Sequence, residues 1–150
     1  MSSVPRAVLR TIIIAGFTAG TIDIAAACLI NMRSLMVILQ AIASGLLGRA
    51  SFQGGAFAAV LGLILQWAMS CLIAAIYVLV VRRMALLRRN WIASGVAFGC
   101  IVFIVMNYVV VPLSAVGHAP KFTAATFAEN LLAMVLFGLI IAFIDKPKRT

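Results

Sequence analysis

The sequence predicts an all-α, polytopic membrane protein, on the basis of its composition and the length of its apolar runs. Of 150 residues, 65% are hydrophobic and 10% are charged, whereas a soluble domain is about half apolar and about a quarter charged. Several runs are long enough to cross a bilayer, which takes ~20 apolar residues in a helix. The strands of a transmembrane barrel would instead alternate over about ten residues. We therefore expect residues 1–150 to form a single helical transmembrane domain.

Four runs qualify as transmembrane helices, at about residues 10–32, 56–81, 91–114 and 127–144. The first is expected to be retained, because its apolar stretch is too long for a signal peptide and no clear small-residue cleavage site ends it. A further run at about residues 34–48 has an apolar part of only about 14 residues, which is short for a span. It is expected to be either an interfacial helix on the outer surface or a re-entrant helix inside the bundle.

The distribution of Lys and Arg predicts the orientation. With four spans and both termini cytoplasmic, nine of these residues lie inside and three outside; with residues 34–48 as a fifth span, four lie inside and eight outside. The positive-inside rule favours the first arrangement. The basic segments "RRMALLRR" and "DKPKRT" then face anionic lipid head groups at the cytoplasmic surface. We expect no nucleic-acid partner, because that would need a basic soluble surface.

Small residues four positions apart recur on three of the spans. In lipid, packing rather than hydrophobicity drives helix association, and small residues let two backbones approach closely. We therefore expect a tight bundle. The pairs are Gly16 and Gly20 on the first span, Ala58 and Gly62 on the second, and Gly95 and Gly99 on the third.

Asp23 lies in the middle of the first span, in a chain with only three acidic residues. It follows Gly20 by three residues, so it faces the helix contact rather than lipid. A charged Asp at mid-span costs ~2.5–3.5 kcal/mol, which favours a neutral, hydrogen-bonded form. Gln66 is the expected partner, because it lies at a similar depth in the second span. Asp23 is then either a structural bond between helices or a site for a proton, an ion or a substrate.

Other polar residues are expected in the outer half of the bundle. They either line a vestibule open to the outside or form the ordinary polar edge of a thin bundle. The membrane-interior candidates beyond Asp23 and Gln66 are Asn107, Glu129 and Asn130. A re-entrant segment would line a cavity with polar and small residues of the short helix and its turn, namely Gln40, Ser44, Gly45, Gly48 and Arg49.

No catalytic or metal-binding set is present in the sequence. The single histidine, His118, falls in a loop, and the three cysteines lack metal-ligand spacing. No nucleotide-binding glycine motif or nucleophile motif occurs. We therefore expect a protein that is not an enzyme and that carries no cofactor and no metal.

Three stretches resemble the YagU-like group of small bacterial inner-membrane proteins: "AGFTAG", "SGVAFGCIVFIVMNYVVVPLSAVGHAP" and "FAENLLAMVLFGLIIAF". The resemblance implies a bacterial inner membrane and a multi-pass architecture, and implies no particular activity. Where such relatives carry histidines, this chain has Asn107 and, before the apolar part of the last span, Leu132 or Ala133. A proton-handling role based on those histidines therefore does not carry over.

Two hypotheses for the function follow. The first is an oligomeric, channel- or transporter-like protein for a small solute or ion, with Asp23 in the membrane interior and dimerisation through the glycine faces. The second is a non-catalytic accessory protein that packs against or stabilises a membrane protein or a lipid. An Asp23→Asn variant separates them, because a structural hydrogen bond tolerates the amide and an ion-binding or titrating site does not.

Overall fold

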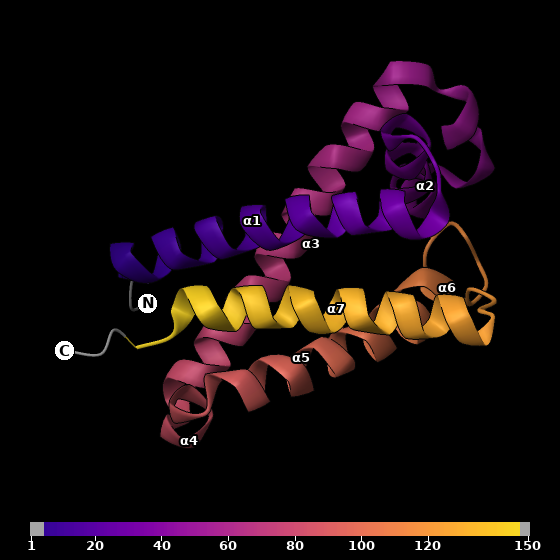
Figure 1. The fold of residues 1–150 in the computed structure, drawn as a ribbon. Coiled ribbons are helices and arrows are strands. Elements are labelled where there is room, and N and C mark those ends of the chain that lie inside the picture. The colour runs from indigo at the N-terminus through magenta and orange to yellow at the C-terminus, as the bar shows by residue number, and fades with distance from the viewer. Residues whose placement is uncertain (1–4, 148–150) are drawn as a thin grey trace.

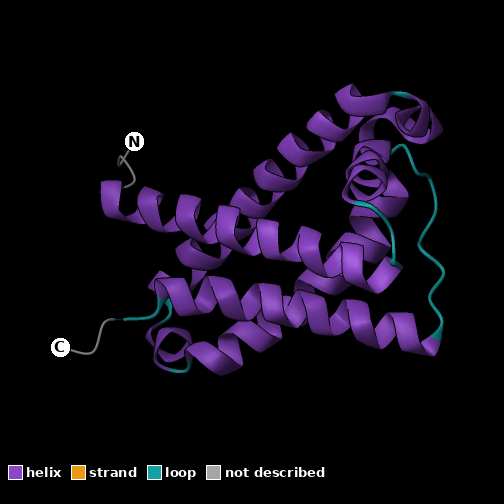
Figure 2. Cartoon of the chain, turned by 45° about the horizontal axis from the view of Figure 1, so that its top comes forward, coloured by secondary structure: helices purple, strands orange, loops and turns teal. Residues whose placement is uncertain are grey.

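The computed structural model describes residues 5–147, and most of them lie in helices joined by turns and one longer loop (Figure 2). No strand occurs in that part of the chain. The predicted all-α class is therefore confirmed.

Four long helices make up most of the structure. They are α1 (Arg6–Asn31), α3 (Gly55–Arg83), α5 (Trp91–Val105) and α7 (Ala124–Asp145). Shorter elements lie between them, three of which precede α5. These are α2 (Leu35–Leu47), the 3₁₀ turn η1 (Gly48–Gln53) that continues it, and α4 (Ala85–Arg89), which joins α3 to α5.

Beyond its end, α5 continues through a π turn, η2 (Met106–Val110), into a last helical turn, α6 (Val111–Leu113). The π turn ends two residues before Pro112, which lacks an amide donor and whose ring crowds the preceding turn. The helix ends at Leu113, one residue after the proline.

Local capping explains why α7 begins before the predicted residue 127. The Thr123 hydroxyl accepts a hydrogen bond from the Thr126 amide at 3.2 Å, and the Thr126 hydroxyl accepts one from the Thr123 amide at 2.9 Å. This reciprocal cap satisfies two amides that the first turn leaves free. The helix consequently starts at Ala124.

Five helical stretches, rather than the four expected, are long and apolar enough to cross a membrane. The additional stretch is Leu35–Gln53, which combines α2 with η1. Only 13 of its residues are α-helical. The fold is thus compatible with a multi-pass membrane protein, and the apolar stretch around its short helix is longer than the sequence predicts.

The helix α1 lies between α3 and α7. Its buried residues Val8, Ile12 and Ala15 join one apolar cluster with Tyr77 of α3 and Ile141 of α7. On the other side of α7 lies α5, and α2 packs against α3 (Figure 1). The start of α1 and the end of α7 lie at the same end of the bundle, whereas α2 lies at the opposite end (Figure 1).

The small residues singled out in the sequence lie at contacts between helices. A Cβ atom added to Gly16 would lie 2.6 Å from the Cys71 Cα of α3, and one added to Gly99 would lie 2.6 Å from the Val135 Cα of α7. A Cβ on Gly20 would meet Ser70, one on Gly62 would meet the Leu39 backbone of α2, and one on Gly95 would meet Ala142; Ala58 is fully buried.

These contacts correct the expectation that the glycine faces mediate dimerisation. Both glycine pairs pack against helices of the same chain, Gly16 and Gly20 on α3 and Gly95 and Gly99 on α7. They are therefore not available to a second copy while the bundle is folded.

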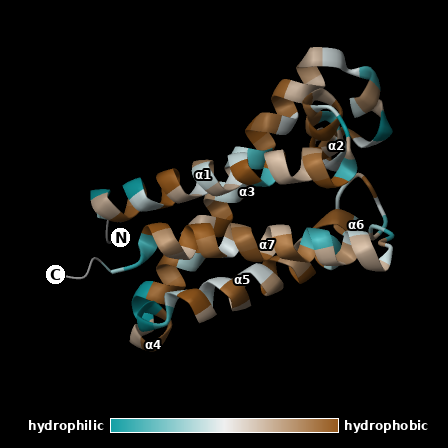
Figure 3. Ribbon diagram, viewed as in Figure 1, coloured by the Kyte–Doolittle hydropathy of each residue, from teal (hydrophilic) through white to brown (hydrophobic). Residues whose placement is uncertain are grey.

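The outer surface of the helices is largely apolar, and polar residues concentrate toward the two ends (Figure 3). Large side chains such as Leu72, Ile76 and Ile101 are at least half exposed. Soluble proteins rarely expose contiguous apolar surface on this scale. This distribution is typical of helices that face lipid.

Candidate functional site

Asp23 and Gln66 face each other between α1 and α3. The Gln66 Nε2 donates a hydrogen bond to the Asp23 Oδ2 at 2.8 Å, and both residues are half-buried. Asp23 is on the same face of α1 as Gly16, which lies two turns earlier. The close approach of the backbones at Gly16 and Gly20 is what brings the two side chains within reach.

A second hydrogen bond crosses the same interface one residue along α3. The Trp67 indole Nε1 donates to the Thr21 Oγ1 at 3.2 Å. Thr21, Asp23, Gln66 and Trp67 thus form a line of polar contacts, which we call the polar seam. Among residues 5–147, the hydrogen bonds of these side chains join α1 only to α3.

The polar seam lies between two apolar clusters. One contains Ala19 of α1 and Ala74 of α3, and the other contains Ile24 of α1 and Ala59 of α3. In such surroundings an unpaired carboxyl or amide would be costly, because no water replaces the missing bond. The hydrogen bond between Asp23 and Gln66 offsets that cost for one oxygen of the carboxyl and one amide N–H.

The polar residues expected at the outer end bond locally. Asn31, Asn107 and Asn130 each donate to the carbonyl four residues earlier in their own helix, at 2.8, 2.9 and 2.7 Å. Glu129 is exposed. Within residues 5–147 no hydrogen bond joins any of them to Asp23 or Gln66. The candidate polar residues of the membrane interior therefore do not form one hydrogen-bonded site with Asp23 and Gln66.

The short helix is attached to its neighbours through its polar and small residues. The buried Gln40 donates to the Gly55 carbonyl at the start of α3, at 3.1 Å. The Gly45 carbonyl accepts from the Ala115 amide of the loop after α6, at 2.9 Å. Ser44 bonds within α2, Gly48 has a φ of 62°, and Arg49 is exposed.

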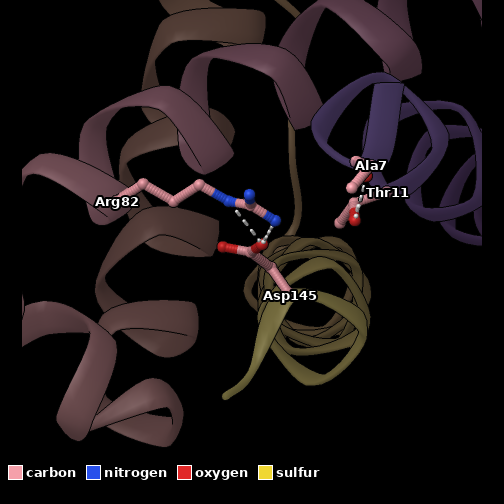
Figure 4. A network of polar contacts seen from close by, with 4 residues as sticks. All are labelled: Ala7, Thr11, Arg82 and Asp145. Carbon is pink, nitrogen blue, oxygen red and sulfur yellow. Dashed lines mark hydrogen bonds and ion pairs between the residues drawn. The ribbon is translucent and has the colours of Figure 1, made fainter. Parts of the chain in front are cut away.

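An ion pair at the other end of the bundle was not anticipated from the sequence. The Arg82 Nε and a terminal nitrogen donate to the Asp145 Oδ1 at 3.0 and 2.7 Å (Figure 4). The Asp145 side chain is 1% exposed and that of Arg82 is 30% exposed. This pair joins α3 to α7, with Thr11 of α1 beside it (Figure 4). Each residue directly follows the end of its predicted span, and the two ends are predicted on the same side of the membrane. That shared position was the one indication of the ion pair that the sequence offered.

A second missed contact joins α3 to α5. The Tyr77 and Ser94 hydroxyls lie 2.7 Å apart, and Ser94 also bonds to the Trp91 carbonyl at 3.1 Å. Both side chains are buried. The three cysteines are free, and in the described part of the chain no three His, Cys, Asp or Glu side chains form a group that could hold a metal ion.

Comparison with known proteins found no relative of this chain. No protein-family profile, no curated protein and no solved structure matches the chain.

Proposed function

We propose that the protein is a non-catalytic, four-span component of a bacterial inner membrane, related to the YagU-like group, that holds a membrane partner and does not conduct a solute. The supporting observation is that Asp23, the one acidic residue in the middle of a span, forms a hydrogen bond between two tightly packed helices. Asp23 is bonded to Gln66 in the interface where Gly16 and Gly20 bring the backbones together.

The four-span arrangement is supported by where the helix ends lie. Arg82 at the end of α3 contacts Asp145 at the end of α7, and Val8 at the start of α1 belongs to the same cluster as Val81. Four spans return the chain to its starting side, whereas five would not. The 13 residues of α2 extend about 20 Å, which is short of a core of about 30 Å.

The depth of α2 favours a re-entrant helix over one resting on the surface. Leu39 of α2 packs with Ile24 of α1 and Ala59 of α3, and each of these lies at least one turn inside its own long helix. Gly62 contacts the Leu39 backbone. We therefore place α2 among the outer turns of α1 and α3.

The distribution of positive charge supports a cytoplasmic location for the end of the bundle that holds the start of α1 and the end of α7. The end of the bundle that holds the start of α1, the end of α3 and α4 carries Arg6, Arg10 and the arginines of α3 and α4. The opposite end carries Arg33, Arg49 and Lys121. The excess at the first end is the asymmetry that the positive-inside rule assigns to the cytoplasm.

A second function, an oligomeric channel or transporter, is favoured by one specific observation. Only one oxygen of the Asp23 carboxyl has a hydrogen-bond partner among residues 5–147, so the other could bind a proton or a cation. An oligomer of this kind would have to assemble through a face other than the glycine contacts.

Flux through liposomes separates the two functions. We would reconstitute the wild type, Asp23→Asn and the matched control Glu129→Gln, and measure proton and cation flux with ion-sensitive dyes. We expect no flux above empty liposomes in any of the three, because Asp23 serves as a bond between two helices. The Asp23→Asn variant should still fold, since its amide oxygen can accept the hydrogen bond from Gln66. Flux in the wild type and in Glu129→Gln that is lost in Asp23→Asn would establish the transporter instead.

A further inference from the structure

An apolar slot opens between α3 and α5 beside the arginine-rich turn of α4. Its volume is about 190 Å³, and its walls include Val80 of α3, Leu87 of α4, and Ala97 and Ile101 of α5. The slot exists because α3 packs on α1 and α2 while α5 packs on α7, so that the two helices diverge from α4 (Figure 1).

The polar side chains that line the slot are hydrogen-bonded to each other. The Tyr77 and Ser94 hydroxyls form a hydrogen bond across its inner wall at 2.7 Å. The slot therefore offers an occupant apolar contact and no hydrogen-bonding group. An extended polypeptide segment placed there would leave its own backbone polar groups unsatisfied, whereas an acyl chain has none.

Three arginines are close in sequence to residues that line the slot. Arg83 follows the slot residue Val81 by two positions, and Arg88 and Arg89 follow Leu87 directly. All three are exposed. Arg82 is engaged with Asp145, and this is the one ion pair that residues 5–147 form. The charge beside the slot is thus positive and without an anionic partner from that part of the chain.

We propose that this slot binds an anionic phospholipid of the surrounding membrane, with one acyl chain between α3 and α5 and the phosphate on Arg83, Arg88 and Arg89. A zwitterionic lipid carries its own cation beside the phosphate, so it gains less from three arginines. The inference rests on the proposed function, since it places this end of the bundle at the cytoplasmic leaflet and names the partner.

Native mass spectrometry of the full-length protein in detergent tests the site. The wild type is titrated with phosphatidylglycerol and, separately, with phosphatidylcholine of the same chains. We expect one phosphatidylglycerol to be retained preferentially. Replacing Arg83, Arg88 and Arg89 together by Gln should weaken that preference about ten- to a hundredfold, because each arginine near an anionic head group contributes several-fold. The same change at Arg33, Arg49 and Lys121 is the matched control and should leave it unchanged.

A second variant addresses the acyl chain. Ala97→Trp fills the slot and should abolish retention, whereas Ala25→Trp at an exposed position of α1 should not. Because Ala97→Trp could also unfold the bundle, the arginine triple variant, which changes only exposed side chains, gives an independent result. Equal retention of the two lipids, or a preference that survives the triple substitution, would overturn the proposal. So would a polypeptide that displaces phosphatidylglycerol from the slot.

The outcome is distinguishable from a failure of the proposed function. Asp23-dependent flux in liposomes would overturn the non-conducting role and leave lipid retention unaffected. Loss of the lipid preference without flux would overturn only the lipid site.

Discussion

The two helix pairs α1–α3 and α5–α7 are both closed by glycine, but they are held in different ways. In α5–α7 the glycines occur on both helices, and Gly138 lies directly against the backbone of Gly95 and Gly99. In α1–α3 they occur on one helix only, where Gly16 and Gly20 face Cys71 and Ser70. The α1–α3 pair adds the polar seam and one aromatic contact, Phe17 with Trp67, at a centroid distance of 4.9 Å. The α5–α7 pair adds aromatic contacts such as Trp91 with Phe143, at 5.7 Å.

The difference shows two ways in which the register of two packed membrane helices can be determined. Lipid supplies no hydrophobic drive between helices, so shape and hydrogen bonds must decide their register. Glycine against glycine is specific by shape, because backbone fits backbone. In α1–α3, Gly16 also meets backbone, at the Cys71 Cα, but Gly20 meets the Ser70 side chain, where the fit is less exclusive. There the hydrogen bond from Gln66 to Asp23 distinguishes the correct register from its neighbours.

The largest effect is expected where α3 is joined to α7. Arg82→Leu leaves the Asp145 carboxylate, which is 1% exposed, without its partner. Breaking such a pair costs about 3 kcal/mol or more of unfolding free energy, whereas replacing both partners by apolar groups is close to neutral. We expect Arg82→Leu to be strongly destabilised in an SDS-unfolding titration, and the double variant with Asp145→Leu to recover much of the loss. A double variant as unstable as the single one would contradict this interpretation.

The same glycine-to-alanine change should cost more at Gly99 of α5 than at Gly20 of α1. In Gly99→Ala the new Cβ meets the Val135 Cα at 2.6 Å, and backbone cannot move aside. In Gly20→Ala it meets the Ser70 hydroxyl at 2.5 Å, which can rotate, and the Ser70 Cβ at 2.9 Å, which needs only a small shift of the helix. We expect losses of about 2–3 kcal/mol and about 1 kcal/mol in unfolding free energy, respectively. Ala128→Leu on the exposed face of α7 is the control. Equal losses at the two glycines would remove the distinction between a glycine that meets backbone and one that meets a side chain.

The smallest effect is expected at the edge of the polar seam. Thr21→Val removes the acceptor of the Trp67 indole, at 3.2 Å in the structure. Hydrogen bonds between membrane helices average about 0.6 kcal/mol, so we expect a loss of that size in the same titration. Thr18→Val, at an exposed position of α1, should be neutral. A loss at Thr18 equal to that at Thr21 would indicate a propensity effect rather than a lost bond.

Position along the helices was the part of the arrangement that the sequence could predict. Apolar run length set the long helices to within a few residues, because a backbone in lipid must satisfy its own hydrogen bonds. Counting from the span ends placed Asp23 and Gln66 at one level, and the structure shows them bonded. Helix spacing also placed Gly16, Gly20, Gly95 and Gly99 where backbones meet.

The sequence could not predict how each helix is rotated about its axis or which side chains of neighbouring helices contact each other. The sequence shows that Arg82 and Asp145 end at the same side, but not that α3 and α7 turn those residues toward each other. The Tyr77–Ser94 contact depends on the angle at which α3 and α5 leave α4. Nor could depth alone show that the glycine faces are used within the chain, because both an internal contact and a dimer place glycine at a helix crossing.

The central claim is that Asp23 bonds α1 to α3 for structure, and a double-mutant cycle with Gln66 tests it most directly. Asp23→Leu, Gln66→Leu and the double variant would be compared with the wild type by unfolding in lipid bicelles. We predict a coupling energy of about 0.5–1.5 kcal/mol, with Asp23→Asn close to the wild type in stability. Additive losses from the two single changes, with no coupling between them, would contradict it.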